Sequence, residues 1–174
     1  MIRWLIALLQ NETVHGFVAS QAWVWPICEI IHFVGMSLLI GVVGLLDLRL
    51  LGVAKGLPAE AVKRLVPWGV AGLALNVITG YVFVAGAPAG PVEHLTNTAF
   101  QLKAAFMLLA GINVGVFHVT GASRALRAVG PGADAPFAAQ IVAATSLVLW
   151  LGVIYFGRMI MYADSFYVRE YYGF

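Results

Sequence analysis

Four long apolar segments restrict the folds that are available to this chain. They cover about residues 22–51, 65–87, 100–121 and 137–163. Each reaches the roughly 20 residues that an α-helix needs to cross the hydrocarbon core of a bilayer. The strict two-residue alternation of a membrane-spanning β-barrel is absent from these segments. Because short connections join the segments, the sequence predicts an all-α integral membrane protein with its four helices in an antiparallel four-helix bundle.

Composition supports a single membrane domain over residues 1–174. The chain is 61% hydrophobic and 10% charged, whereas a soluble domain carries about 25% charged residues. The net charge of +2 is spread over several loops, without a basic cluster that would indicate nucleic acid binding. A single cysteine, Cys28, excludes an internal disulfide and a paired zinc motif. The lipid bilayer is therefore the expected surrounding of this protein.

The first 20 residues form too short and too interrupted an apolar run to span a membrane. Trp4, Leu5, Leu8 and Leu9 follow the spacing of one helix face. No small-residue cleavage site follows them, so we expect this segment to be retained rather than removed as a signal peptide. We predict an interfacial helix over residues 1–20, lying on the membrane surface.

Lysine and arginine placement predicts the orientation of the bundle. The connection between the second and third segments, GAPAGPVEHLTNT, has neither residue type, whereas the first and third connections are basic. Their basic residues are Arg49, Lys55, Lys63 and Arg64 in the first, and Arg124 and Arg127 in the third. Because cytoplasmic loops are enriched in these residues, we expect both termini on the outer side of the membrane.

His32 is the most informative residue inside the first apolar segment. An ionisable side chain at membrane depth is costly to bury unpaired and marks a functional site by default. Glu29 lies one helical turn before it and Met36 one turn after it, on the same face. The imidazole is expected either to bind a cofactor or to form a hydrogen bond with Glu29 or a backbone carbonyl.

The interpretation that we favour is a b-type haem near the outer surface. His32 would be an axial ligand, because imidazole nitrogens commonly bind haem iron. His94 or His15 would be the second ligand. Lys103 and Arg158 lie near the outer ends of their segments and would pair with the haem propionates. The protein would then be a membrane cytochrome b that transfers electrons, either linked to quinol or as a subunit of a larger redox complex.

His118 lies about 18 residues into the third segment, near its cytoplasmic end. The depth difference from His32 is about 12–14 Å at the rise of an α-helix, too large for both to bind one iron. His118 follows Gly111 and Gly115, whose spacing suits either close helix packing or a flat ligand. It would bind a second, inner haem or pair with Asp47. The sequence therefore predicts one haem and does not decide whether a second is bound.

Two other functions are compatible with these residues. Cys28, His32 and Met36 recur at four-residue spacing, and their thiolate, imidazole and thioether groups suit copper(I). The same residues are also ordinary packing residues of apolar helices. The third possibility is an accessory subunit that binds another membrane protein through its small-residue faces.

Small and charged residues also predict helix contacts. Gly72, Asn76 and Gly80 recur at four-residue spacing on the second segment and indicate a close helix contact.

Asp47 and Arg49 point about 200° apart on a helix, so they cannot face each other. We therefore expect Asp47 to contact a neighbouring segment, as an architectural residue.

Two motifs resemble an uncharacterised family of bacterial four-span membrane proteins. The first is W-P-x-x-E-x-x-H, from Trp25 to His32, followed by D-L-R-L-L-G at residues 47–52. The second is N-x-x-F-x-x-K from Asn97 to Lys103, followed by Asn113 and by Phe117-His118. More distantly, the chain resembles copper-resistance membrane proteins and haem-binding protoporphyrinogen oxidases of bacteria. The resemblance implies a four-span architecture in the bacterial inner membrane. Together with the lysine and arginine placement, this puts both termini on the periplasmic side.

Overall fold

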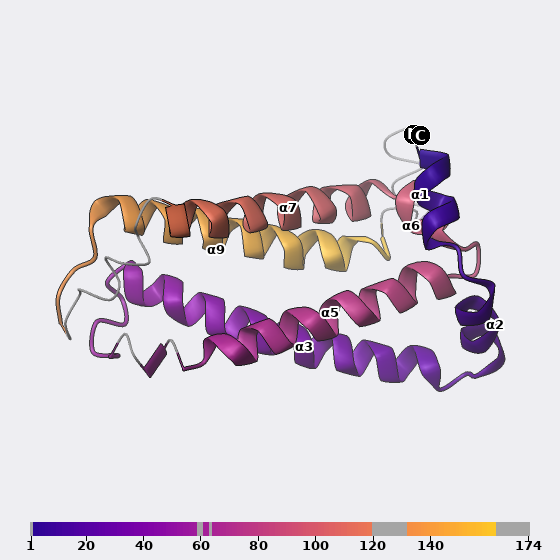
Figure 1. Cartoon of the computed structure of the whole chain (residues 1–174), viewed down its shortest axis with the longest axis horizontal. Helices are drawn as coiled ribbons and strands as arrows, with labels where there is room; N and C mark the ends of the chain where they lie inside the picture. The colour runs from indigo at the N-terminus through magenta and orange to yellow at the C-terminus, as the bar shows by residue number, and fades with distance from the viewer. Residues whose placement is uncertain (1, 59–60, 63, 120–131, 163–174) are drawn as a thin grey trace.

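The computed structural model describes residues 2–58, 61–62, 64–119 and 132–162. Within these residues the chain is all-α and has no strand. The helices are α1 (Ile2–Leu9), α2 (Glu12–Ser20), α3 (Val24–Leu50), α5 (Val66–Gly86), α6 (Pro91–Leu95), α7 (Thr98–Val119) and α9 (Phe137–Met159). The four long helices form a bundle (Figure 1), which confirms the predicted fold class.

All four long helices are long and apolar enough to cross a membrane. Their ends lie within four residues of the predicted segments, although positions 120, 121 and 163 fall outside the described residues. Only 6–33% of the residues in their most apolar stretches are buried inside the protein. The apolar side chains therefore face outwards, as expected of a multi-pass membrane protein in contact with lipid.

Prolines and one asparagine set where the long helices begin. Pro67 lies in the first turn of α5, and Pro136 directly precedes α9. Proline is tolerated there because the first backbone N–H groups of a helix have no partner within the helix. The side chain of Asn97 caps α7, since its Oδ1 accepts a hydrogen bond of 3.1 Å from the Phe100 backbone N–H.

The bundle consists of two closely packed helix pairs. α3 packs along α5 and α7 packs along α9, while contacts between α3 and α9 join the pairs (Figure 1). Gly35 and Gly72 bring α3 and α5 together, because a Cβ on Gly72 would lie only 2.5 Å from the Gly35 carbonyl oxygen. The predicted contact at Gly72 and Asn76 is therefore present, whereas no atom lies within 4 Å of a Cβ built on Gly80.

The N-terminal segment forms two short helices instead of the single interfacial helix expected over residues 1–20. The chain breaks at Asn11, whose Oδ1 accepts a hydrogen bond of 3.0 Å from Val14 N and so begins α2. α1 contacts α6, and α2 contacts α5. Figure 1 shows both helices lying across one end of the bundle, beside the start of α3. This end, with α6, is referred to below as the α1–α2 end.

Arg49 stabilises the opposite end of the bundle. Its side chain is fully buried, with Nε donating to the Leu57 carbonyl at 2.9 Å and Nη1 donating to the Ala133 carbonyl at 3.3 Å. Lys55 and Asp134 form an ion pair between the same two loops. Arg49 thus joins the connection after α3 to the segment before α9, which is an architectural role.

Candidate functional site

His32 lies on α3 and faces α5. Its Nδ1 is 2.7 Å from Oγ1 of Thr79, and that hydroxyl is also 2.7 Å from the Leu75 carbonyl oxygen. The carbonyl can only accept a hydrogen bond, so it takes the single hydroxyl proton. Thr79 Oγ1 must therefore accept from His32 Nδ1–H. This assignment leaves Nε2 of His32 with a free lone pair, which is the form of imidazole that binds metals.

Glu29 is not the partner of His32. Its Oε1 accepts a hydrogen bond of 3.2 Å from the indole N–H of Trp25, at an exposed position. The His32 ring instead contacts Phe83 of α5 edge-on, with 5.3 Å between the ring centroids. Of the partners expected for His32, the carboxylate is thus excluded, and Thr79 is a partner that the sequence did not indicate.

Lys103 lies on α7, within electrostatic range of both His32 and His94. Its aliphatic chain runs across Gly157 of α9, where a Cβ would lie 3.5 Å from Lys103 Cδ. The structure therefore brings together His32, His94 and Lys103 towards the α1–α2 end of the bundle.

His94 lies in α6, outside the membrane-spanning helices. Its Nδ1 is buried and has no hydrogen-bond partner among the described residues. The ring contacts Phe100 edge-on at 5.5 Å. Burial lowers the pKa of His94, the Glu93 carboxylate offsets part of that effect, and the Lys103 charge lowers the pKa further. The imidazole is therefore kept neutral and is able to bind a metal.

Two other predicted site residues, His15 and Arg158, have different surroundings. His15 lines a small cavity between α1, α2 and the α5–α6 connection, and neither His32 nor His94 lines that cavity. Arg158 is exposed near the end of α9 and contacts the ring of Tyr162, 5.7 Å from its centroid. Arg158 also donates to the Tyr162 hydroxyl at 3.5 Å.

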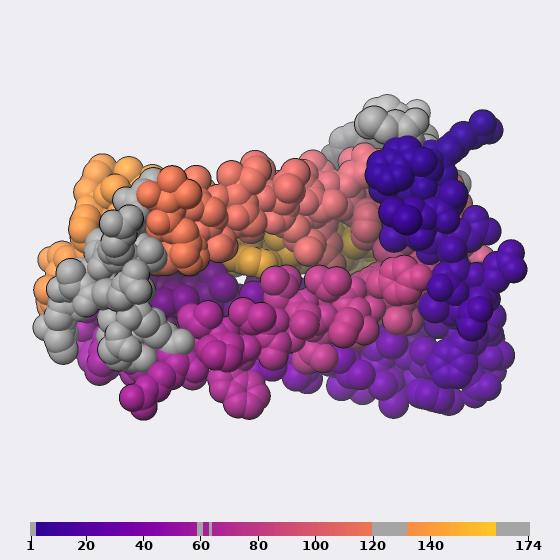
Figure 2. Space-filling model, viewed as in Figure 1, coloured from indigo at the N-terminus to yellow at the C-terminus, as the bar shows by residue number. Residues whose placement is uncertain are grey.

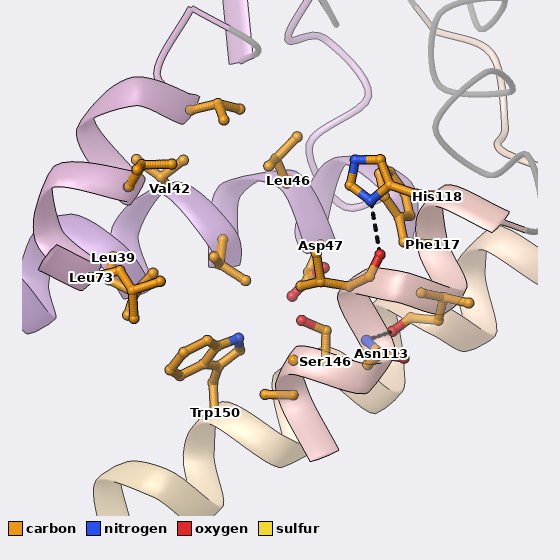
Figure 3. Close-up of a pocket in the computed structure, with 18 of the residues that line it drawn as sticks. Leu39, Val42, Leu46, Asp47, Leu73, Asn113, Phe117, His118, Ser146 and Trp150 are labelled. Carbon is orange, nitrogen blue, oxygen red and sulfur yellow. Dashed lines mark hydrogen bonds between the residues drawn. The ribbon is translucent and has the colours of Figure 1, made fainter. Parts of the chain in front are cut away.

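A cavity of about 600 Å³ occupies the other half of the bundle. It lies between the two helix pairs, and its walls are almost entirely apolar. In Figure 2, atoms of α9 lie at the bottom of the groove between α5 and α7. The polar side chains that line it are those of Asp47, Asn113, His118, Ser146 and Trp150 (Figure 3).

Asp47 and His118 are the ionisable residues of this cavity. Asp47 is 6% exposed, and its Oδ2 has no hydrogen-bond partner among the described residues. The Ser146 hydroxyl of α9 faces this carboxyl group, so Asp47 contacts a neighbouring helix (Figure 3). His118 Nδ1 lies 2.8 Å from the Val114 carbonyl and must donate to it. Nε2 of His118 is therefore an acceptor.

The two predicted small residues of α7 differ in their surroundings. Gly111 lines the cavity, whereas Gly115 does not. A Cβ on either residue would meet no atom within 4 Å, so neither glycine forms a close helix contact within the described chain. Gly111 therefore leaves open space beside the backbone of α7, where a ligand in the cavity could contact it.

The residues proposed for copper share one helix only. Cys28 and Met36 lie on α3, one turn before and one turn after His32. In the part of the chain that the structure describes, no group of three His, Cys, Asp or Glu side chains is arranged to hold a metal ion.

The asparagines of the second motif join α7 to α9. Asn97 Nδ2 donates to the Ile160 carbonyl at 3.1 Å, and Asn113 Nδ2 donates to the Val142 carbonyl at 3.1 Å. No sequence pattern indicated a role for these residues or for Thr79, Ser146 and Trp150. Their polarity inside apolar segments was the available signal, because such residues form hydrogen bonds between membrane helices.

Comparison with known proteins gives no relative. No family model matches the chain, and neither a curated protein nor a solved structure matches it.

Proposed function

We propose that this protein is a membrane-embedded b-type cytochrome with His32 as an axial ligand of its haem. The supporting observation is the chain of hydrogen bonds from His32 Nδ1–H through Thr79 Oγ1 to the Leu75 carbonyl. Metal-binding histidines generally donate their second ring N–H to such a partner, which fixes the tautomer and the ring orientation.

His94 is the better candidate for the second axial ligand. Its buried Nδ1 lacks a partner among the described residues, and an unpaired buried nitrogen is costly unless a ligand occupies it. Lys103 acts electrostatically on both His32 and His94, so all three belong to one region. His15 lines a different cavity. In this proposal Lys103 pairs with a haem propionate, and Arg158 supplies a second cation nearer the surface.

A bound haem would supply one-electron transfer at its iron, while the protein supplies orientation, burial and charge. Thr79 would hold the His32 ring, Phe83 would exclude water beside it, and Lys103 would balance propionate charge. The electron donor is a quinol or a protein partner of a larger membrane complex.

The first experiment is an absorption spectrum of the detergent-purified protein. Haem bound through imidazole is expected to give a strong band near about 410–430 nm that shifts on reduction. His32→Ala should remove this band or strongly reduce it, and His94→Ala should change its position. His15→Ala is the matched control, because this histidine lies outside the group, and it should leave the spectrum unchanged.

A featureless spectrum of the protein, expressed with sufficient haem, would overturn the cytochrome proposal. Metal analysis of the same sample then separates the alternatives. Copper that is lost in Cys28→Ser would establish a copper-binding protein. If neither haem nor copper is present, the accessory-subunit interpretation becomes the leading one.

We further propose that the α1–α2 end faces the periplasm of a bacterial inner membrane. The basic residues Arg49 and Lys55 lie at the opposite end of the bundle, as the positive-inside rule requires of the cytoplasmic side. Single cysteines placed at Ala89 and Lys55 in a Cys28→Ser background test this orientation. A membrane-impermeant thiol reagent should label position 89 in intact cells and position 55 only after the membrane is opened. The reverse pattern would invert the topology.

A further inference from the structure

We propose that the cavity between the two helix pairs binds a membrane-soluble hydroquinone. The cavity is distinct from the group at His32, because Asp47 lies 15 residues further along α3, about 22 Å at the helical rise. Its volume of about 600 Å³ is within the range of pockets that hold small organic ligands. The proposal does not depend on the haem at His32.

When it is ionised, the Asp47 carboxyl offers an unpaired oxygen that can accept a hydrogen bond from a ligand. This side chain is more than nine-tenths buried, faces the cavity, and leaves Oδ2 without a partner among the described residues (Figure 3). Arg49, the nearest cation in sequence, donates to the Leu57 and Ala133 carbonyls of the loops. A bound hydroxyl group would satisfy Oδ2, whereas a purely apolar ligand would leave it unsatisfied.

His118 places a second acceptor on the facing helix. The Val114 carbonyl accepts the hydrogen bond from Nδ1–H. In the neutral ring, Nε2 therefore carries the lone pair and accepts a hydrogen bond from a ligand. The two acceptors therefore lie on different walls of one cavity, Asp47 on α3 and His118 on α7. With Asp47 ionised and His118 neutral, a hydroquinone has a hydroxyl group to donate to each acceptor, whereas a quinone has only carbonyl oxygens and donates to neither.

The remaining lining residues suit an aromatic head group. Trp150 presents a flat ring to the cavity, and its N–H can donate to a hydroxyl oxygen, which accepts as well as donates (Figure 3). The Asn113 amide nitrogen is already bonded to the Val142 carbonyl. Gly111 leaves its stretch of α7 without a side chain, so a planar ring can lie close to the helix.

The cavity also opens to the lipid, as an isoprenoid tail requires. Its rim includes Val70 on α5 and Val114 on α7, which are 60% and 49% exposed. These side chains lie in membrane-spanning helices, so the surface that they expose contacts acyl chains. A hydroquinone could therefore enter sideways from the bilayer and leave its tail between α5 and α7.

Binding of a short-chain ubiquinol analogue tests the proposal, with quenching of Trp150 fluorescence as the readout. The experiment uses the full chain in lipid nanodiscs, and Trp150→Phe identifies the signal of this residue. We expect the quinol to bind at least about tenfold more tightly than its quinone. The quinone cannot donate the hydrogen bonds that the quinol hydroxyls make, and one of these is to the ionisable Asp47. Asp47→Asn should remove most of this preference, and Asp134→Asn, at an exposed loop position, should not.

Gly111→Leu and Gly115→Leu form a matched pair that is independent of Asp47. Both glycines have open space around a new Cβ, but only Gly111 lines the cavity. Gly111→Leu should block quinol binding, whereas Gly115→Leu should preserve it. Equal or tighter binding of the quinone, or unchanged binding in both Asp47→Asn and Gly111→Leu, would overturn the proposal. The fluorescence measurement does not use haem absorbance. A negative result would therefore overturn the hydroquinone proposal without bearing on the cytochrome proposal.

Discussion

Nδ1 of His32 and Oγ1 of Thr79 lie 2.7 Å apart and join the first two membrane-spanning helices through a single side-chain hydrogen bond. Thr79 is 3% exposed, and its hydroxyl donates a hydrogen bond to the Leu75 carbonyl. The threonine therefore determines which nitrogen of His32 is available, although it lies 47 residues away in the sequence.

Thr79→Val should weaken haem binding without removing the axial ligand. Valine keeps the size of threonine but cannot accept the Nδ1–H bond, so the His32 ring loses its fixed tautomer and orientation. Loss of such a supporting partner typically lowers metal affinity by about 10–100-fold, and a haem titration followed by absorbance measures the change. Thr79→Ser, which keeps the hydroxyl, should bind haem nearly as tightly as the native protein. Equal affinities for all three proteins would contradict the role assigned to Thr79.

Gly72→Ala should destabilise the bundle, and Gly80→Ala should not. A methyl group on Gly72 would lie 2.5 Å from the Gly35 carbonyl oxygen and 2.8 Å from the Leu39 nitrogen, so α3 and α5 would have to separate. We expect a cost of about 1–3 kcal/mol. At Gly80 the methyl meets open space, and alanine should be neutral or stabilise the helix by up to about 1 kcal/mol. Thermal unfolding in detergent compares the two variants; similar losses in both would show that the contact at Gly72 is not limiting.

Asn97→Ala should cost more stability than Asn113→Ala. Asn113→Ala loses a hydrogen bond from α7 to the Val142 carbonyl of α9, and Asn97→Ala loses one from the start of α7 to the Ile160 carbonyl at the end of α9. Such bonds between membrane helices are worth on average about 0.6 kcal/mol. Asn97 also caps α7, and loss of such a cap costs about 1 kcal/mol. Gln101→Ala removes only an exposed bond to the Leu95 carbonyl and should have little effect. The three variants can be ranked by chemical or thermal unfolding in detergent, and a different order would argue against the capping role.

The stability of the protein should fall as the pH decreases below about 6.5, in part because of His94. Its folded-state pKa is lowered, chiefly by burial, so the unfolded chain takes up a proton first. Above the ordinary value of about 6.5 both states are neutral and His94 contributes no pH dependence. His94→Gln should therefore reduce the loss of unfolding temperature between about pH 7.5 and 5.5. The same dependence in the variant and in the native protein would assign the effect to other groups.

The sequence by itself determined the number, length and approximate ends of the spanning helices, because helix length and apolarity are local properties of each segment. It also singled out His32, Lys103 and His118, since ionisable groups are rare at membrane depth. It correctly expected Asp47 to contact a neighbouring helix, because the side chain cannot reach Arg49 on its own helix.

Only the tertiary structure decided what these residues contact. The lipid-facing and helix-facing sides of an apolar helix carry similar residues. The sequence therefore does not predict which side of α3 contacts α5, or that a cavity lies near Asp47. Thr79 became the partner of His32 in place of Glu29 because Gly35 and Gly72 allow the two backbones to approach. The divergence of α5 from α7, which leaves the cavity lined by Asp47 and His118, likewise depends on how two helix pairs pack rather than on either segment alone.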